Sequence, residues 1–189
     1  MVETSKEPAQ VKYSATLTIL LLLGVLLFGG CANNDWRTAS RASAGIAPDP
    51  ATTDEAVLIV FGANAWGWRG WFAIHTWIAA KHGGESAYTV YDVVGWRARN
   101  GQPVMQVTQD IPDRYWFGER PRIIKQFRGA GVDKLIAEVD KAAQEYPWKD
   151  TYTAFPGPNS NTFVAWIGKR VPELQLTLPL SAIGSGYAD

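Results

Sequence analysis

One hydroxyl, one imidazole and one carboxylate of this chain have the types and order needed for acyl transfer. Ser160 lies at the start of a predicted helix, His75 in an apolar run that predicts a strand, and Asp92 in the next such run. A hydroxyl at a helix N-terminus meets unpaired N–H groups and the positive end of the helix dipole, which stabilise an oxyanion. A nearby imidazole can take the hydroxyl proton, and a carboxylate can orient the ring. The pattern therefore predicts a hypothetical catalytic set: Ser160 as nucleophile, His75 as base and Asp92 as the orienting group.

Each of these residues also has a purely structural interpretation. Serine is a preferred N-cap residue, so Ser160 can serve only to start its helix. A histidine in an apolar strand is commonly a hydrogen-bonded core residue, and an aspartate such as Asp92 is commonly solvated or a cap. The sequence leaves both interpretations open.

Aromatic residues suggest a binding surface instead. The chain has nine tryptophans, and several of them lie with arginines in two segments bounded by glycine or proline. If exposed, such rings can stack on sugars or lipid; if buried, they belong to the core. With two asparagines that flank Ser160, the candidate binding residues are Trp66, Trp68, Arg69, Arg114, Tyr115, Trp116, Asn159 and Asn161.

Composition argues against several kinds of partner. The chain has 18 basic and 18 acidic residues, so it offers no electrostatic footprint for nucleic acid, and no such partner is expected. It has two histidines and one cysteine, too few nitrogen and sulfur ligands for a typical zinc site, so no metal is expected. The glycine-rich stretch 62–70 lacks the spacing of a phosphate-binding loop, and no cofactor is expected.

Hydrophobic patterns predict one α+β domain over residues 56–189. An apolar period of 3.6 residues from Val132 to Tyr146 predicts a helix that ends at Pro147. A second helix is expected over 159–171, with Asn159 or Ser160 as its N-cap. These helices are expected to pack on an antiparallel sheet of about four or more strands. The predicted strands cover residues 56–64, 71–80, 87–96 and 103–110.

The N-terminal residues predict export and lipidation. The uncharged apolar run 15–28 follows Lys6 and Lys12 and precedes two glycines, which is typical of a secretory signal peptide, here residues 1–30. The sequence Phe-Gly-Gly-Cys resembles a bacterial lipoprotein signal, so lipid is expected on Cys31, the chain's single cysteine. The polar stretch 31–55 is then expected to be a flexible tether. The expected location is the cell envelope, anchored in the membrane, and the outer membrane rather than the inner one.

Four stretches carry a resemblance to a known family: AWGWRG, HTWI, PDRYWFG and PGPNSNTF. From about residue 56 to 187 the chain resembles domain of unknown function 3750, a bacterial family, and the resemblance implies no established activity. More distantly, a histidine strand followed by an Asn-X-Asn-X-Phe helix is similar to circularly permuted papain-like domains of the PPPDE and lecithin retinol acyltransferase types. In those domains the helix motif carries the nucleophilic cysteine, which implies a permuted papain-like fold with Ser160 at the nucleophile position.

The presence of serine rather than cysteine at position 160 bears on the choice between two functions. A thiol is partly ionised near neutral pH, whereas a serine hydroxyl needs a base to accept its proton. The sequence therefore favours an envelope lipoprotein whose domain is a non-catalytic binding module for a glycan, peptide or lipid. The alternative is a hydrolase or acyltransferase that acts on an envelope amide or ester through Ser160 and His75.

Overall fold

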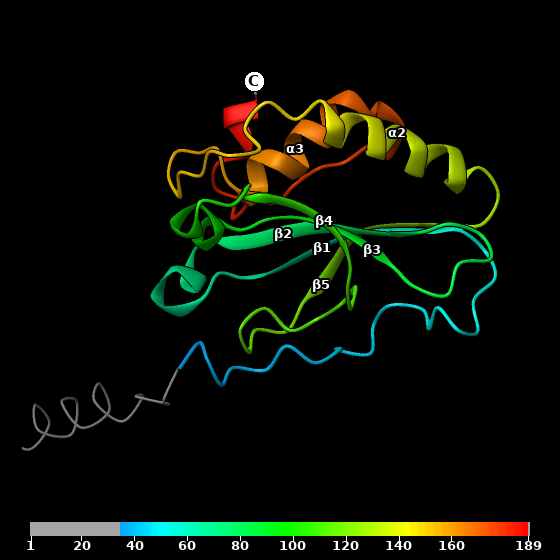
Figure 1. Ribbon diagram of the computed structural model, residues 1–189, viewed down its shortest axis with the longest axis horizontal. Helices are drawn as coiled ribbons and strands as arrows, with labels where there is room; N and C mark the ends of the chain where they lie inside the picture. Colours follow the sequence, from blue (N-terminus) through cyan, green and yellow to red (C-terminus); the bar gives the residue numbers. More distant parts are fainter. Residues whose placement is uncertain (1–34, 189) are drawn as a thin grey trace, which may run out of the picture. The chain divides into compact units, whose positions relative to one another are not determined.

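The domain is built on a five-stranded sheet in which all neighbouring strands run antiparallel, in the order β4-β3-β2-β1-β5 (Figure 1). The structure, a computed structural model, describes residues 35–188. Two longer helices accompany the sheet, which confirms the predicted α+β class. The strands are β1 (Val57–Asn64), β2 (Ile74–Lys81), β3 (Thr89–Val93), β4 (Met105–Gln109) and β5 (Arg122–Arg128). The helices are α2 (Val132–Gln144) and α3 (Ser160–Arg170), with short 3₁₀ helices η1 (Gly67–Trp71), η2 (Gly95–Asn100), η3 (Pro172–Leu174) and η4 (Ser185–Ala188).

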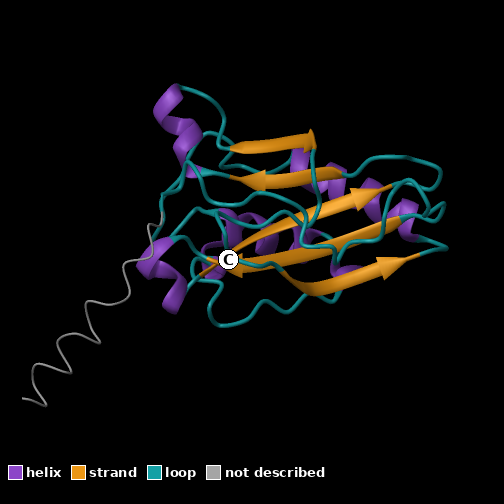
Figure 2. Ribbon diagram, turned by 90° about the horizontal axis from the view of Figure 1, so that it is seen from below, coloured by secondary structure: helices purple, strands orange, loops and turns teal. Residues whose placement is uncertain are grey.

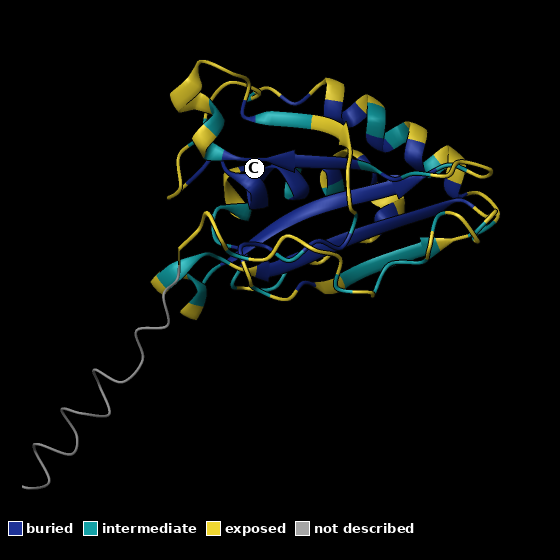
Figure 3. Ribbon diagram, turned by 60° about the horizontal axis from the view of Figure 1, so that its bottom comes forward, coloured by how far each residue is buried: buried dark blue, intermediate teal, exposed yellow. Residues whose placement is uncertain are grey.

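Both faces of the central strands are buried (Figure 3). Side chains alternate along a strand, so Leu58 and Val60 of β1 join the core beneath α2 and α3. Ile59 and Phe61 belong to a second core on the other face. Burial on both faces explains why β1 has a continuous apolar sequence rather than an alternating one.

The observed strand boundaries differ from the predicted ones near the aromatic residues. Residues 71–73 do not extend β2, because Trp71 ends η1 and is exposed. Residues 94–96 likewise leave β3, and η2 starts at Gly95. Strand β5 was not predicted: it forms an edge of the sheet, and its sequence RIIKQFR mixes charged and apolar residues.

Residues 40–55 differ from the expected tether, because the structure places them against the sheet face opposite the helices (Figures 1 and 2). The buried Asp113 carboxylate accepts hydrogen bonds from the N–H groups of Ile46 and Ala47 at 2.6 and 3.1 Å. Tyr88 donates its hydroxyl proton to the Pro48 carbonyl at 3.0 Å. Ile46 and Ala47 are partly buried against the core on this face, and hydrogen bonds to distant residues hold the segment there.

The predicted signal peptide and Cys31 lie outside the described residues. Among residues 35–188, no helix has the length and apolar character needed to cross a membrane.

Topology gathers several connections at one end of the sheet. In the antiparallel order, η1 links β1 to β2 and η2 links β3 to β4, so both short helices lie at the same end. The start of α3 reaches this end too, since Asn161 Nδ2 donates to the Ile74 carbonyl at 2.9 Å. We call it the η1–η2 end. Near it lie the second residue of β2, the fourth of β3 and the first of α3, which are His75, Asp92 and Ser160.

Candidate functional site

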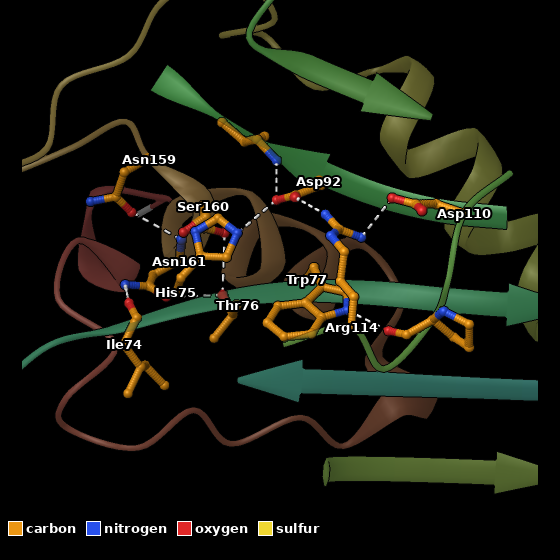
Figure 4. A network of polar contacts seen from close by, with 12 residues as sticks. Ile74, His75, Thr76, Trp77, Asp92, Asp110, Arg114, Asn159, Ser160 and Asn161 are labelled. Atoms are coloured by element: carbon orange, nitrogen blue, oxygen red, sulfur yellow. Dashed lines mark hydrogen bonds and ion pairs between the residues drawn. The ribbon is translucent and has the colours of Figure 1, made fainter. Parts of the chain in front are cut away.

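A buried carboxylate bridges a histidine and an arginine side chain at the η1–η2 end (Figure 4). Asp92 Oδ1 lies 2.9 Å from His75 Nε2, and Asp92 Oδ2 accepts a hydrogen bond from Arg114 Nη2 at 2.8 Å. The N–H of Val93 also donates to Oδ1 at 2.7 Å. Burial by itself would raise the pKa of Asp92, but His75, Arg114 and the Val93 amide together hold it below its ordinary value. Asp92 is therefore ionised.

An ionised Asp92 defines the tautomer of a neutral His75. The carboxylate can only accept, so Nε2 carries the proton and Nδ1 presents a lone pair. Within residues 35–188, Nδ1 has no hydrogen-bond partner. The ring plane is fixed by Trp116, which stacks on the imidazole with a centroid separation of 3.4 Å and an interplanar angle of 5°. The Nε2 edge of the ring is thus held by Asp92, and Nδ1 on the other edge is free to accept a hydrogen bond.

The first half of β2, which carries His75, contacts the start of α3. Strands β2 and β3 pair only between Ile78–Ala80 and Thr89–Tyr91, so the first half of β2 has no strand partner on that side. The start of α3 takes the place of the missing strand. Thr76 Oγ1 donates to Asn161 Oδ1 at 2.9 Å and lies 3.3 Å from the Ser160 carbonyl oxygen. These contacts hold the start of α3, with Ser160 as its first residue, against the segment of β2 that carries His75 (Figure 4).

The N-cap of α3 is Asn159, not Ser160. Asn159 Oδ1 accepts from the N–H groups of Asn161 and Thr162 at 2.9 and 3.2 Å, and Thr162 Oγ1 accepts from the Asn159 N–H at 3.1 Å. These contacts form a capping box. The hydroxyl of Ser160 is therefore not needed to start the helix. In the part of the chain that the structure describes, this hydroxyl makes no hydrogen bond, to His75 or to any other residue.

The backbone amide of Ser160 is also without a partner among the described residues. The next two amides of α3 bond to Asn159 Oδ1, and the Phe163 amide bonds to the Asn159 carbonyl at 3.0 Å. A free N–H at a helix N-terminus can donate to an oxyanion and adds to the helix dipole there. The hydroxyl of Ser160, its own N–H and Nδ1 of His75 together provide a nucleophile, an oxyanion donor and a base.

The two asparagines predicted to bind a ligand bind the chain itself. Asn159 Nδ2 donates to the carbonyls of Ala154 and Ile183, both at 3.1 Å. Asn161 Nδ2 donates to the Ile74 carbonyl and to that of Ile183, at 2.8 Å for the latter. Both side chains are buried. Their hydrogen bonds connect the loop before α3 and the C-terminal segment to the start of the helix.

The predicted aromatic and arginine residues differ in how far they are exposed to solvent. Arg114 and Trp116 are buried around His75, Tyr115 and Trp66 are partly buried, and only Trp68 and Arg69 are exposed. The sequence prediction did not include Trp96, which is exposed at the same end together with Trp71. A signal for Trp96 was present, because the tripeptide Gly-Trp-Arg of η1 recurs at the start of η2.

Arg114 has a second acidic partner that the prediction did not include. Its Nη1 lies 3.1 Å from Asp110 Oδ2, at the surface end of the cluster. Within residues 35–188, no group of three or more His, Cys, Asp or Glu side chains is arranged to hold a metal ion.

Comparison with known proteins identifies a family. Residues 55–187 match the model of DUF3750, described as a protein of unknown function. No curated protein and no solved structure matches the chain. The match covers more than half of the sequence, and the chain belongs to the DUF3750 family.

Proposed function

We propose that this domain is an acyl-transfer enzyme, a hydrolase or acyltransferase, with Ser160 as its nucleophile. The observation that carries the proposal is the proton arrangement on His75: Asp92 holds the Nε2 proton and leaves the lone pair of Nδ1 free, while the next residue, Thr76, hydrogen-bonds to the start of α3, where Ser160 lies. A serine nucleophile requires such a base, because its hydroxyl does not ionise alone. The order of histidine strand and nucleophile helix supports the papain-like ancestry suggested by the sequence.

The reaction uses groups of this chain only. Ser160 Oγ attacks the carbonyl carbon of an amide or ester while its proton passes to Nδ1 of His75. The Ser160 N–H and the α3 dipole stabilise the oxyanion, and Asp92 stabilises the imidazolium. The imidazolium then gives its proton to the leaving amine or alcohol, and an acyl-serine ester remains. Water or another acceptor, deprotonated by His75, attacks this ester and restores the Ser160 hydroxyl.

Substrate binding has to complete the Ser160–His75 contact, since these residues form no hydrogen bond in the described chain. Catalytic hydrogen bonds are often long or misaligned without substrate and tighten in the complex. The hydroxyl is not committed to capping, so Ser160 can change its χ1 rotamer without breaking an existing hydrogen bond.

The proposed location is the bacterial envelope, with a lipid anchor on Cys31. The sequence supports this through Lys6 and Lys12, the apolar run 15–28 and the Phe-Gly-Gly-Cys motif. Ala32 follows the cysteine and carries no acidic retention signal, which favours the outer membrane. An amide or ester of the envelope is then the substrate class.

A non-catalytic binding module is the second candidate, and one observation favours it. Ser160 and His75 are only 3% and 6% exposed, and Trp116 covers one face of the imidazole. A substrate carbonyl reaches Ser160 only if the surrounding loops move. In this alternative the exposed aromatic residues of the η1–η2 end bind a ligand, and the buried cluster is structural.

A serine-reactive fluorophosphonate probe separates these two functions. The purified full-length protein is expected to be labelled, and Ser160→Ala is expected to remove the label. Ser86→Ala is the matched control, because Ser86 is exposed in the β2–β3 connection, away from the site, and should leave labelling unchanged. His75→Ala should also abolish labelling, because serine then has no base. A folded wild-type protein that takes no label, or labelling that survives Ser160→Ala, would reject Ser160 as the nucleophile.

A further inference from the structure

The η1–η2 end exposes several large apolar side chains. Trp71 and Trp68 of η1 are 91% and 67% exposed, and Trp96 of η2 is 41% exposed. Phe72, which follows η1, is half exposed. Because η1 and η2 connect strand pairs at one end of the sheet, these rings are exposed at the same end of the domain (Figure 1). Soluble proteins seldom expose several tryptophans together without a partner for them.

Two further loops extend the same surface. Phe155 precedes α3 and Leu180 lies in the C-terminal segment, and both are largely exposed. The hydrogen bonds of Asn159 to the carbonyls of Ala154 and Ile183 hold these two loops beside the N-terminus of α3. The surface therefore surrounds the end of the domain at which Ser160 lies.

The charges within this surface are positive. The sequences of η1 and η2, GWRGW and GWRARN, contain three arginines and no acidic residue. The Arg69 guanidinium lies 6.0 Å from the Trp68 ring, and that of Arg41 lies 5.9 Å from the Trp96 ring. Tryptophan prefers the headgroup level of a bilayer, and arginine is attracted to anionic lipid. A neutral sugar would supply the stacking partner but no countercharge for the arginines.

The first described residues of the chain contact this same end. Arg41 contacts the Trp96 ring of η2 and the Phe117 ring, so the N-terminal segment enters the domain there. Ten residues separate Arg41 from Cys31, and an extended chain spans roughly 36 Å over that length. A lipid anchor on Cys31, which is part of the proposed function, would keep this end within that distance of the bilayer.

We infer that the η1–η2 end is a peripheral membrane-binding surface. Trp68, Trp71 and Trp96 lie in the headgroup region of the bilayer, and Arg69 and Arg99 contact anionic phospholipid. The surface orients the anchored domain, because a lipid on Cys31 alone does not determine which face of the domain meets the bilayer. It also turns Ser160 and His75 toward the bilayer, which makes an amphiphilic amide or ester the substrate that reaches them.

Site-specific labelling of the full chain tests this orientation. Cys31→Ser removes the only thiol, and Trp71→Cys then carries an environment-sensitive nitrobenzoxadiazole label at the surface. Ser86→Cys is the matched control, exposed in the β2–β3 connection at the opposite end of the sheet. Both proteins are reconstituted by detergent removal into vesicles of phosphatidylethanolamine and phosphatidylglycerol. A doxyl-labelled lipid in these vesicles quenches labels that enter the headgroup region.

The label at position 71 is expected to shift its emission to the blue and to be quenched several-fold more than the label at position 86. Equal quenching at the two positions would overturn the inference. Arg69→Gln with Arg99→Gln should reduce the quenching at position 71, as should replacing phosphatidylglycerol with phosphatidylcholine. If neither the arginine substitutions nor the change of lipid reduces the quenching at position 71, anionic headgroups are not the partner of this surface. The measurement needs neither Ser160 nor lipidated Cys31, so its failure is distinct from that of the proposed function.

Discussion

Replacing Asp92 by asparagine should destabilise the fold markedly. The substitution keeps the size of the side chain but removes the negative charge between His75 and Arg114. Removing one partner from a buried ion pair costs about 3–5 kcal/mol, because the remaining charge is left buried. Arg114 keeps Asp110 as a partner at 3.1 Å, and that carboxylate is partly exposed. We therefore expect a loss near the lower limit, about 3 kcal/mol of the free energy of unfolding.

Urea unfolding followed by tryptophan fluorescence measures this loss. Asp54→Asn is the control, because Asp54 is exposed and an exposed substitution of this kind changes stability by about 0.5 kcal/mol or less. If Asp92→Asn costs no more than Asp54→Asn, the carboxylate is not the countercharge that we describe.

The same carboxylate gives a prediction for pH with a defined sign. The pKa of Asp92 is lowered in the folded state, so its stabilising contribution is full above the ordinary aspartate pKa of about 3.9. The contribution is lost as the pH falls through the lower, folded value. The stability difference between wild type and Asp92→Asn should hence be constant near neutral pH and shrink below about pH 4. A difference that grows on acidification would contradict this assignment.

Three further predictions concern other parts of the chain. Asn159→Ala removes the cap of α3 and should cost about 2 kcal/mol by urea unfolding, whereas Asn100→Ala, at an exposed position, should cost about 0.5 kcal/mol or less; similar losses would refute the capping role. Asp113→Asn should increase hydrogen exchange at the amides of Ile46 and Ala47, which donate to this carboxylate, and unchanged exchange would show that other contacts hold the segment. Metabolic labelling with palmitate should mark the wild type but not Cys31→Ser, and an unlabelled wild type would reject the lipid anchor.

The sequence predicted the buried elements of the fold better than the exposed ones. Strand β1 and helix α2 bury strong apolar patterns, one continuous and one with a 3.6-residue period. Strand β5 carries three charged residues and lies at the sheet edge, so its pattern resembles that of a loop. Residues 40–55 have small side chains, and the contact that fixes two of their amides is a carboxylate about 66 positions away. A local pattern contains no information about such a partner.

For the candidate site, the sequence indicated some of the residues that come together but not the contacts that each one makes. His75 and Asp92 lie on neighbouring strands, and the structure joins them by a hydrogen bond, as the hypothesis required. Arg114 and Trp116 were predicted to bind a ligand, but they hold Asp92 and His75 in place. Whether an aromatic ring is exposed depends on tertiary packing, and so does the choice between Asn159 and Ser160 as N-cap. Composition and spacing do not determine either.

The charge state of Asp92 is the strongest structural argument that this cluster has a function. A buried ion pair is often no more stable than apolar residues of the same volume, so stability alone does not explain why the core contains one. Perturbed ionisable groups gather at functional sites because catalysis needs charges that water would otherwise screen. Here the buried charge directs one proton to Nε2 of His75 and leaves the lone pair of Nδ1 free, and the hydroxyl of Ser160, at the start of α3, is not committed to capping. The unpaired Nδ1 of His75 is the property that the proposed role of general base requires.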